Sequence, residues 1–564
     1  MAKGKAEPKT LPRPALPLEA LLLLAPFFLG CYYPWASALA ALYLLGLLVL
    51  WQRKQPLVLP ASPLLLAAVL IVLFHLLGAV WGVDKGMAPF GALKFLPLPL
   101  FVLALDQLKP EERMGLFRRL PAAACVMVVL SLLLSLVPAL RDWFVINNRQ
   151  AGFFQYPNTY ALYLLAAVAV TLFGAPLRFG RLPYLAVLLA GIALSGSRTV
   201  FLLLIPLLLF ACFAEKDRRK RTRLLLFLAG LLAVGIAYVL LTGDRATIGR
   251  FLTISLGSSE FLGRLLYARD ALPVILKHPF GLGYLGYSWL QGSFQTGVYA
   301  VRHVHNELLQ LLVDTGWIPA VLFVCAFVRA FRAPSDRRLR RVLLLMIGLH
   351  CLLDFDTQFV AVAMLLFTAM DAEPQGKKSV KAGGAVFAVG ALLGVFALYF
   401  GAADFTSFCG RTEATVKLYP AYTSAWVELL PEAQTAEELD AVADRILKVN
   451  QSVSLAHSAR ASAAFSQGKF NTAVQEKEEA IRLAKYTREE YLDYFDMLES
   501  AYGIYTAAGE EASASFCLEK MKAIPDMLHE ADAGTSRLGR LILDLPQLDF
   551  PAEYQARLDS LTGK

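Results

Sequence analysis

The feature that most constrains the fold of this chain is a series of thirteen apolar runs, several of them 17 to 25 residues long. A helix needs about 20 predominantly apolar residues to cross the hydrocarbon core of a bilayer. Only 18% of the residues are charged, whereas soluble domains contain about a quarter. We therefore predict an all-α, polytopic helical membrane protein with about thirteen transmembrane helices. The predicted spans lie near residues 16-33, 35-51, 62-82, 90-106, 120-140, 158-174, 182-196, 199-214, 222-241, 306-331, 340-353, 358-370 and 382-402.

The short loops between these runs predict how the chain crosses the membrane. Lys and Arg are enriched in cytoplasmic loops, and with the N-terminus in the cytoplasm every strongly basic short loop falls inside. These inner loops are Arg53-Lys54, Lys109 to Arg119, Arg178 to Arg181, Lys216 to Arg223, Arg329 to Arg341, and Lys377 to Lys381. The outer side then receives the turn 83-89, residues 141-157, the turn at 195-198, the large loop 242-304, the turn 354-357 and the tail from 403. No small-residue cleavage site follows the basic segment Met1 to Arg13, so we expect no removable signal peptide.

The side of the tail depends on residues 342-370. If these residues formed one tilted span, the tail would be cytoplasmic. Asp354 and Asp356 would then lie near the middle of the bilayer, where a charge is costly. We therefore predict two short spans that meet outside the membrane, followed by an extracytoplasmic tail.

The charges divide the chain into a transmembrane domain, residues 1-402, and a helical tail domain, residues 403-564. The tail holds 26 acidic and 16 basic residues, a net charge of −10; since the whole chain carries +9, the first 402 residues carry about +19. Ala461 to Leu483, with a turn at Gly468, has the small-residue spacing of a tetratricopeptide helical hairpin. A second approximate unit surrounds Gly509. These two glycines are 41 residues apart, so we predict a degenerate helical repeat rather than a strict array.

The sequence Arg302-His303-Val304-His305-Asn306-Glu307 closes the large loop where the 306-331 run begins. A metal site needs three or four ligands, but acidic residues are sparse nearby and the seven cysteines form no CxxC pair. We therefore predict no metal and no cofactor. Two roles stay open for the imidazoles. Both could cap the following helix, or His305 (or His303) could act as a base or orient a hydroxyl.

Four arginines accompany these histidines on the predicted outer side: Arg149, Arg198, Arg264 and Arg302. Any one of them could simply extend its head group into the membrane interface. A planar guanidinium also binds phosphate oxygens in a bidentate manner, and the positive-inside rule gives no reason for an arginine on the outer side. We therefore favour an anionic ligand for Arg198 and Arg264, with Arg149 and Arg302 as further candidates.

Three other positions could contribute to a site. Asn158 follows Tyr156-Pro157 and could be a helix cap or a polar ligand contact. His350 and Asp354 are four residues apart, which on a helix would place them on one face as a structural pair. Asp354-Phe355-Asp356 also resembles the DxD of metal-dependent sugar transferases, although such triplets are common by chance. The glycines of His278-Pro279-Phe280-Gly281-Leu282-Gly283 are expected to bend the large loop back toward the membrane.

Taken together, these elements resemble the O-antigen ligase and polymerase family, including its members with a helical-repeat tail. The resemblance covers residues 150 to 360. Its elements, in order, are Gly152-Phe153-Phe154 with Tyr156-Pro157-Asn158 and Ala161 to Leu165, Ser195-Gly196-Ser197-Arg198, Arg264 with Ala268 to Ala271, His278 to Gly283, His303-Val304-His305-Asn306 with Leu309-Gln310 and Thr315-Gly316, and His350 with Asp354-Phe355. The chain departs from the family at Val304, where a small residue is frequent, and at Glu307, where Asp is frequent.

The resemblance implies a metal-independent, inverting glycosyltransferase of the GT-C type at the outer face of a bacterial plasma membrane. Its donor would be a glycan on a polyprenyl (undecaprenyl) pyrophosphate. The acceptor would be a hydroxyl of a glycolipid, a growing glycan or a protein, corresponding to a ligase, a repeat-unit polymerase or a protein O-oligosaccharyltransferase.

The resemblance also implies which residues form the site. The expected catalytic residues are His305, His303, Arg264 and Arg198. Expected substrate contacts are Arg149, Asn158, Arg302, Asn306, His350 and Asp354. The tail could bind a protein partner, and no nucleic acid is expected. A transporter or flippase for the same lipid-linked glycan is the alternative of another class, although no half-chain repeat is visible.

Overall fold

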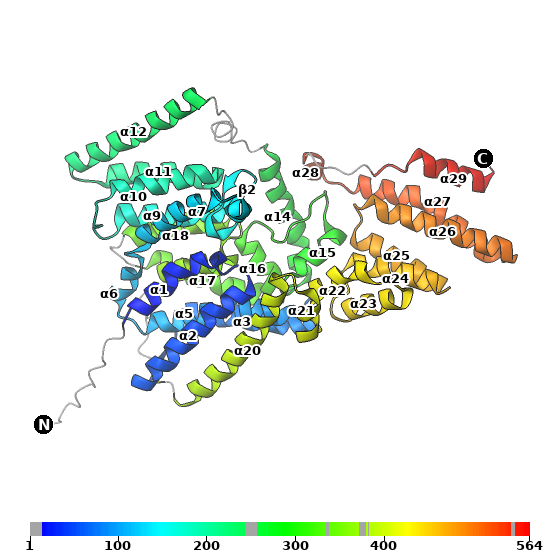
Figure 1. Ribbon diagram of the computed structural model, residues 1–564, viewed down its shortest axis with the longest axis horizontal. Coiled ribbons are helices and arrows are strands. Elements are labelled where there is room, and N and C mark those ends of the chain that lie inside the picture. The colour runs from blue at the N-terminus through cyan, green and yellow to red at the C-terminus, as the bar shows by residue number, and fades with distance from the viewer. Residues whose placement is uncertain are drawn as a thin grey trace.

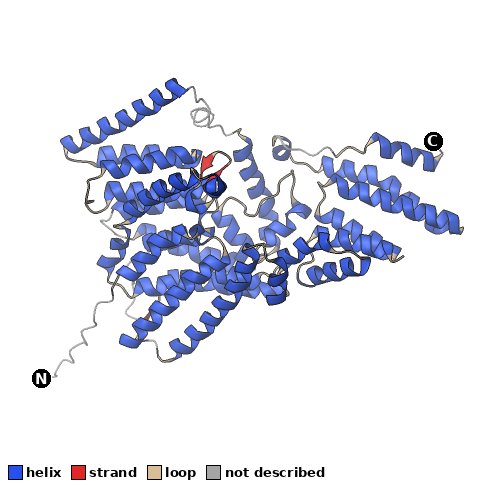
Figure 2. Cartoon of the chain, viewed as in Figure 1, coloured by secondary structure: helices blue, strands red, loops and turns tan. Residues whose placement is uncertain are grey.

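The computed structural model describes residues 14–242, 257–333, 338–370, 379–381, 383–542 and 548–563. The described chain is almost entirely helical (Figure 2). A bundle of helices, the body, forms one half of the molecule, and the helices of the tail extend from it to the side (Figure 1). Several predicted features lie outside the described residues: the N-terminal segment 1–13, residues 243–256 of the large loop, and parts of the inner loops 329–341 and 377–381.

The body contains the helices up to α20. Their bounds are α1 (Leu16–Leu24), α2 (Pro34–Lys54), α3 (Pro63–Trp81), α4 (Ala88–Phe95), α5 (Pro97–Asp106), α6 (Pro110–Arg113), α7 (Leu120–Ser135), α8 (Arg141–Phe144), α9 (Pro157–Phe173), α10 (Leu182–Ser195), α11 (Arg198–Ala214), α12 (Arg218–Thr242), α14 (Ser259–Lys277), α15 (Gly286–Phe294), α16 (Glu307–Thr315), α17 (Trp317–Arg332), α18 (Arg338–Cys351), α19 (Val360–Met370) and α20 (Ala385–Phe408). Its short 3₁₀ helices are η1 (Ala25–Phe27), η2 (Leu29–Cys31), η3 (Met114–Phe117), η4 (Pro138–Leu140), η5 (Gly152–Phe154) and η6 (Asp356–Gln358).

Two small antiparallel sheets complete the body. They pair β1 (Val58–Pro60) with β4 (Ser379–Lys381) and β2 (Val145–Ile146) with β3 (Arg149–Gln150). The tail contains α21 (Thr412–Leu418), α22 (Thr423–Leu429), η7 (Leu430–Glu432), α23 (Ala436–Val449), α24 (Ser454–Ser466), α25 (Phe470–Leu483), α26 (Arg488–Ala508), α27 (Glu511–Ala533), α28 (Arg537–Arg540) and α29 (Ala552–Thr562).

Five segments of the described chain are long and apolar enough to cross a membrane: Pro34–Lys54, Pro63–Trp81, Ala88–Asp106, Glu111–Ser135 and Ala385–Phe408. Shorter apolar helices occur at Leu16–Phe27, Pro157–Phe173, Leu182–Ser195, Arg198–Ala214 and Val360–Met370. The protein is thus an all-α protein with several membrane-capable helices, and the count of thirteen spans stays a prediction. Most of these helices contribute to one apolar core, in which α9 is almost wholly buried.

The prediction of one continuous helix over the 306-331 run is wrong. Gly316 adopts φ +76° and separates α16 from α17. A side chain at Gly316 would collide with the carbonyl oxygen of Pro279, so this close approach requires glycine. The predicted division between the 340-353 and 358-370 runs is present, because α18 ends at Cys351 and α19 begins at Val360.

The tail consists of paired helices, as the two glycine turns predict. Gly468, with φ +72°, joins α24 to α25, and Gly509, with φ +75°, joins α26 to α27. A tetratricopeptide assignment stays a prediction. α20 continues to Phe408, past the expected domain boundary at residue 402. The helices of the large loop, α14 and α15, lie on the side of the body that faces the tail (Figure 1).

Candidate active site

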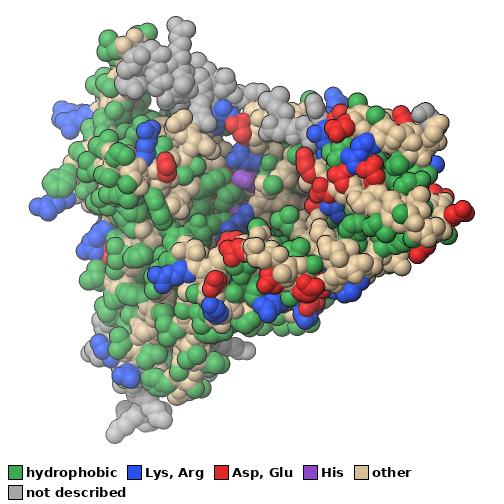
Figure 3. All heavy atoms as spheres, turned by 45° about the vertical axis from the view of Figure 1, so that its right-hand side comes forward, with side chains coloured by type: hydrophobic (Ala, Val, Ile, Leu, Met, Phe, Trp, Pro, Cys, Tyr) green, Lys and Arg blue, Asp and Glu red, His purple; other side chains and the backbone are tan. Residues whose placement is uncertain are grey.

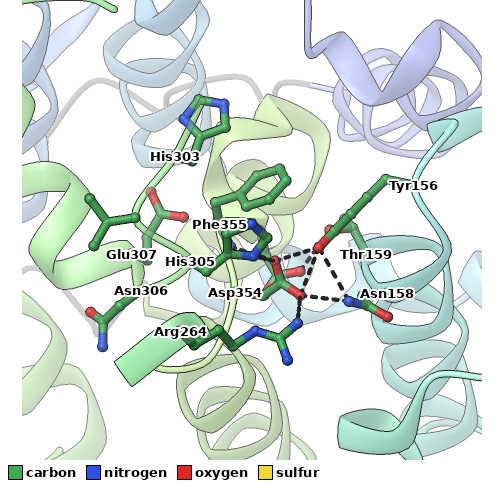
Figure 4. Close-up of polar contacts among 12 residues, drawn as sticks. Tyr156, Asn158, Thr159, Arg264, His303, His305, Asn306, Glu307, Asp354 and Phe355 are labelled. Atoms are coloured by element: carbon green, nitrogen blue, oxygen red, sulfur yellow. Dashed lines mark hydrogen bonds and ion pairs between the residues drawn. The ribbon is translucent and has the colours of Figure 1, made fainter. Parts of the chain in front are cut away.

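The polar centre of the body is Asp354, in the loop between α18 and α19. Only 1% of its side chain is exposed. Four side chains surround its carboxylate, which we call the Asp354 cluster: Tyr156, Asn158, Arg264 and His305 (Figure 4). They come from the start of α9, from α14 and from the loop before α16, so the fold brings together residues up to 198 positions apart in the chain.

Both carboxylate oxygens of Asp354 accept hydrogen bonds. The hydroxyl of Tyr156 donates to Oδ1 at 2.8 Å, and the backbone N–H of Phe355 donates to the same oxygen at 3.1 Å. Nδ2 of Asn158 donates to Oδ2 at 2.9 Å, and Nη2 of Arg264 lies 3.4 Å from it. The carboxylate thus fixes a guanidinium, a phenol and an amide at the same place.

The imidazole of His305 completes the cluster. Its Nδ1 lies 3.3 Å from Oδ1 of Asp354, a close ion-pair distance without the alignment of a hydrogen bond. About a fifth of the His305 side chain is exposed. Its backbone has φ +56°, a left-handed conformation that costs a residue with a side chain on the order of 1 kcal/mol. The surrounding structure therefore holds this imidazole against a local backbone preference.

Burial and neighbouring positive charge have opposite effects on the pKa of Asp354. Burial alone would raise the pKa of its carboxyl, but the interaction with His305 and the positive charge of Arg264 outweigh burial and lower that pKa below its ordinary value. The carboxylate therefore stays negative at any physiological pH. A fixed negative charge beside an imidazole orients the ring.

His303 has a different environment from His305. Its side chain is buried and points away from Asp354 (Figure 4). Its Nε2 lies 2.9 Å from the hydroxyl of Tyr32, and its ring packs on Phe355 with centroids 4.7 Å apart. Burial, with the positive charges of Lys94 and Arg302 next, lowers the pKa of His303 well below its ordinary value. His303 is thus a neutral, packed residue that supports the Phe355 side of the loop.

Asn306 caps a helix, the role that the sequence had left open for the two histidines. Its Oδ1 accepts from the backbone N–H of Leu309 at the start of α16, at 3.0 Å. Its Nδ2 donates to the carbonyl oxygen of Leu352 at 2.8 Å. Asn306 therefore fastens the histidine loop to the end of α18, directly before Asp354.

Arg149 reaches the cluster through Asn158. Asn147 and Asn148, with φ +50° and +58°, form the two-residue turn between β2 and β3, a turn type that favours asparagine. Arg149 leaves this turn, donates from Nη2 to Oδ1 of Asn158 at 2.6 Å, and donates from Nε to the carbonyl oxygen of Ser195 at 2.7 Å. Of the two roles open for Asn158, the cap of α9 is not what the structure shows, because Tyr156 occupies the N-cap. Asn158 instead joins Arg149 to Asp354, and its role as a ligand contact stays a prediction.

Arg198 and Arg302 lie near the cluster without contacting Asp354. Nη1 of Arg198 lies 3.2 Å from Oε2 of Glu260, which is one helical turn from Arg264 on α14. The guanidinium of Arg302 lies over the ring of Tyr32, 5.6 Å from its centroid, on the His303 side of the loop. Figure 3 shows a hollow between the body and the tail, with a histidine inside it and Lys or Arg side chains above and below.

The predicted pairing of His350 with Asp354 is wrong. Nδ1 of His350 lies 2.6 Å from Oδ2 of Asp356, and both side chains are fully buried. Because α18 ends at Cys351, the four-residue spacing of a helix does not extend to Asp354. Asp356 also accepts from the hydroxyl of Thr159 at 2.8 Å. The pair therefore anchors the loop beneath Asp354.

Sequence reasoning assigned no role to three residues that contact Asp354 or the segment just after it. Tyr156 was noted only as part of a motif, yet it donates to Asp354. Glu307 is buried and accepts from the backbone N–H of Thr357 at 3.0 Å. Lys94 is buried in α4 and donates to Oε1 of Gln358 at 3.0 Å. A lysine and a glutamate beside or within apolar runs were the available signal for the last two.

The described residues contain no group of three or more His, Cys, Asp or Glu side chains close enough to hold a metal ion. The Asp354 cluster instead consists of one carboxylate surrounded by a guanidinium, an imidazole, a phenol hydroxyl and an amide.

Part of the chain resembles one known protein family. A model of the O-antigen ligase family matches residues 183–324, a segment that contains Arg198, Arg264 and residues 302–306. Arg149, Asn158, His350 and Asp354 lie outside the match. No curated protein and no solved structure matches the chain. The family match supports a membrane glycosyltransferase-like ligase, with a lipid-linked glycan donor and an acceptor.

Proposed function

We propose that this protein transfers a glycan from a polyprenyl pyrophosphate donor to an acceptor hydroxyl at the outer face of a bacterial plasma membrane, without a metal ion. The observation that carries the proposal is the convergence of Arg264 and His305 on Asp354. The guanidinium of Arg264 can bind the negative oxygens of the pyrophosphate. The imidazole of His305 can accept a proton from the acceptor hydroxyl. Both side chains are about one-fifth exposed, so both can contact substrate.

Arg264 is the residue that we assign to the leaving group. As the bond between the sugar C1 and the phosphate oxygen breaks, the pyrophosphate takes the electron pair and becomes more negative. A fixed cation stabilises that developing charge. Asp354 engages only Nη2 of Arg264, at the long distance of 3.4 Å, and Nε is buried with no hydrogen-bond partner among the described residues. The guanidinium therefore has donors to offer a phosphate. Arg198 is our candidate for the second phosphate, because it pairs with Glu260, which lies one turn before Arg264 on α14.

His305 is the residue that we assign to the acceptor. Because Nδ1 lies 3.3 Å from Oδ1 of Asp354, Nε2 is the ring nitrogen that we assign to accept the proton of the acceptor hydroxyl. The hydroxyl oxygen then forms a bond to C1 on the face opposite the departing phosphate, which inverts the configuration. The negative charge of Asp354 stabilises the imidazolium that this step produces. His303, which is buried and neutral, supports the loop instead.

The polyprenyl chain also has a candidate location. A groove of about 330 Å³ runs between α17 and α18 and is lined mainly by aliphatic and aromatic side chains. It reaches Cys351, Leu352 and Thr357, which flank Asp354 in the chain. An apolar groove that reaches the loop carrying Asp354 fits an isoprenoid attached to the pyrophosphate.

The test is transfer by the purified protein in detergent, with a lipid-linked glycan donor and a panel of acceptors. We expect Arg264→Ala and His305→Ala each to lower the transfer rate by about 100-fold or more, with unchanged protein levels. Arg411→Ala and His529→Ala change exposed residues of the tail and are matched controls that should retain the rate. Full transfer by both site variants would refute the assignment.

The same assay distinguishes the alternative functions. A flippase would leave the donor glycan unconverted in detergent. Product on a glycolipid, a growing glycan or a protein would distinguish ligase, polymerase and protein O-oligosaccharyltransferase.

A further inference from the structure

A second pocket lies at the opposite end of the body from Asp354. It has a volume of about 680 Å³ and opens between the end of α9, the start of α10, the end of α11 and the starts of α12 and α18. α9 begins beside the Asp354 cluster at Pro157 and ends in this pocket at Phe173. At 1.5 Å per residue, its 17 residues separate the two places by about 25 Å. The pocket is therefore independent of the candidate active site.

Four cationic side chains line this pocket: Arg181, Lys220, Arg223 and Arg338. Of the described residues that line the pocket, one carries a carboxylate: Glu215, whose Oε2 lies 3.5 Å from Nη1 of Arg181. Beside the lining, Oδ2 of Asp217 lies 3.9 Å from Nζ of Lys220. Among the described residues, four cations and these two carboxylates leave two positive charges in excess. The cations belong to three elements: the α9–α10 loop, α12 and α18. Like charges gathered in one concave site repel each other, and an anion bound among them offsets that repulsion.

The rest of the lining is apolar. Leu172, Phe173 and Leu177 come from the end of α9 and the loop after it, and Leu182, Leu185 and Ala211 come from α10 and α11. These helices are among the apolar helices of the body. A ligand that satisfies both halves of the pocket must carry an anionic group next to a hydrocarbon chain. A free phosphate ion would use only the cationic half.

We propose that this pocket binds an anionic phospholipid, with its phosphate among the four cations and its acyl chains along the apolar wall. Basic pockets between transmembrane helices on the cytoplasmic side bind such head groups. The positive-inside pattern places Arg181, Lys220, Arg223 and Arg338 on that side. The volume lies within the range of ordinary small-ligand sites.

The lipid would also explain how α12 is held. None of the described side chains of α12 is buried, although the helix runs from Arg218 to Thr242. Lys220 and Arg223 of α12 face a pocket whose other cations belong to the α9–α10 loop and to α18. A phosphate shared among these residues would tie α12 to the body.

The experiment measures lipid retained by the full-length protein purified in mild detergent. Phosphatidylglycerol, phosphatidylcholine and inorganic phosphate are each titrated, with native mass spectrometry and the apparent unfolding temperature as readouts. We expect phosphatidylglycerol to be retained and to raise the unfolding temperature, while the other two do neither. The double variant Lys220→Gln/Arg223→Gln should bind phosphatidylglycerol about tenfold more weakly or worse.

A matched double variant, Arg118→Gln/Arg219→Gln, removes the same charge from exposed residues outside the pocket lining and should bind phosphatidylglycerol normally. The exchange Lys220→Arg/Arg223→Lys keeps the charge and should also bind, which separates loss of charge from misfolding. Equal retention by both Gln double variants would overturn the proposal. Equal retention of phosphatidylcholine, or an equal effect of inorganic phosphate alone, would overturn it as well.

Discussion

At the scale of single residues, Asp354 joins the two halves of the proposed chemistry. One of its oxygens faces His305 and the other faces Arg264. The carboxylate also accepts from Tyr156 and Asn158, so its charge is shared among donors that have no other negative partner within the cluster. A neutral side chain of the same shape should therefore disturb the cluster more than its small change in volume suggests.

Asp354→Asn tests this role. The new amide would turn an N–H toward a donor, either Arg264 or His305, and the negative charge that stabilises the imidazolium would be lost. We expect the transfer rate to fall by about 100-fold or more. The rate is measured with the purified variant, and its unfolding temperature is recorded in parallel. A folded Asp354→Asn variant with a normal rate would remove Asp354 from the mechanism.

The depressed pKa of Asp354 also fixes a pH dependence. A carboxyl whose folded-state pKa is lowered stabilises the protein above its unfolded pKa of about 3.9. That contribution is lost only as the pH falls through the lower folded value. Asp354 should therefore produce no loss of activity between about pH 5 and pH 8.

The sequence identified most of these residues but not their partners. Arg264, His305 and Asn158 were each found from residue type and position on the predicted outer side. Their meeting at Asp354 depends on α14, α9 and the α18–α19 loop packing side by side, which local patterns do not encode. The error at His350 has a local cause, because its spacing to Asp354 assumes a helix that ends at Cys351.

At the scale of elements, the loop from His278 to Gly283 helps to position α16, which follows the histidines of the site. Leu282 donates its backbone N–H to the carbonyl oxygen of Val313 at 2.6 Å, and Gly283 donates to that of Asp314 at 3.1 Å. The loop thus binds the end of α16, whose first turn carries Glu307 and follows the histidines. The sequence predicted a bend here from its glycines, but not that the bend determines where α16 ends.

Gly281→Ala tests this contact. Gly281 has φ +81°, and a Cβ there would lie 2.5 Å from the carbonyl oxygen of Asp314. The strained backbone costs about 1 to 3 kcal/mol, and the collision with a backbone atom adds to it. We expect a lower unfolding temperature and reduced transfer. Gly468→Ala is the matched control, because Gly468 has φ +72° and no described atom within 4 Å of a Cβ. A variant at Gly281 as stable as the one at Gly468 would contradict this account.

At the scale of the whole molecule, the first helices of the tail pack against the body. Tyr422 and Trp426 of the tail share a core with Met87, Phe90 and Tyr284 of the body. The prediction of helical hairpins in the tail followed from Gly468 and Gly509, which are local signals. The shared core could not be predicted, because it joins residues far apart in the chain that carry no common pattern.

A buried carboxylate lies at this junction. Asp84, between α3 and α4, is fully buried and accepts from the hydroxyl of Thr423 at 2.8 Å and from Nδ2 of Asn450 at 3.2 Å. Burial raises the pKa of Asp84 to about 6, although hydrogen bonds from Thr423, Met87 and Asn450 lower it in part. The folded protein therefore holds a proton at Asp84 more readily than the unfolded chain does.

This raised pKa predicts that the docked tail becomes less stable as the pH rises. The contribution of Asp84 is fully present below its ordinary pKa of about 3.9 and is lost as the pH rises through about 6, with a limit of about 3 kcal/mol. Asp84→Asn cannot ionise, so the difference in unfolding temperature between the two proteins should shift in favour of the variant from about pH 4.5 to about pH 7.5. Asp142→Asn, at an exposed position, should show no such trend. If the difference between Asp84→Asn and the unaltered protein were constant over this range, the carboxylate would not control how the tail is held.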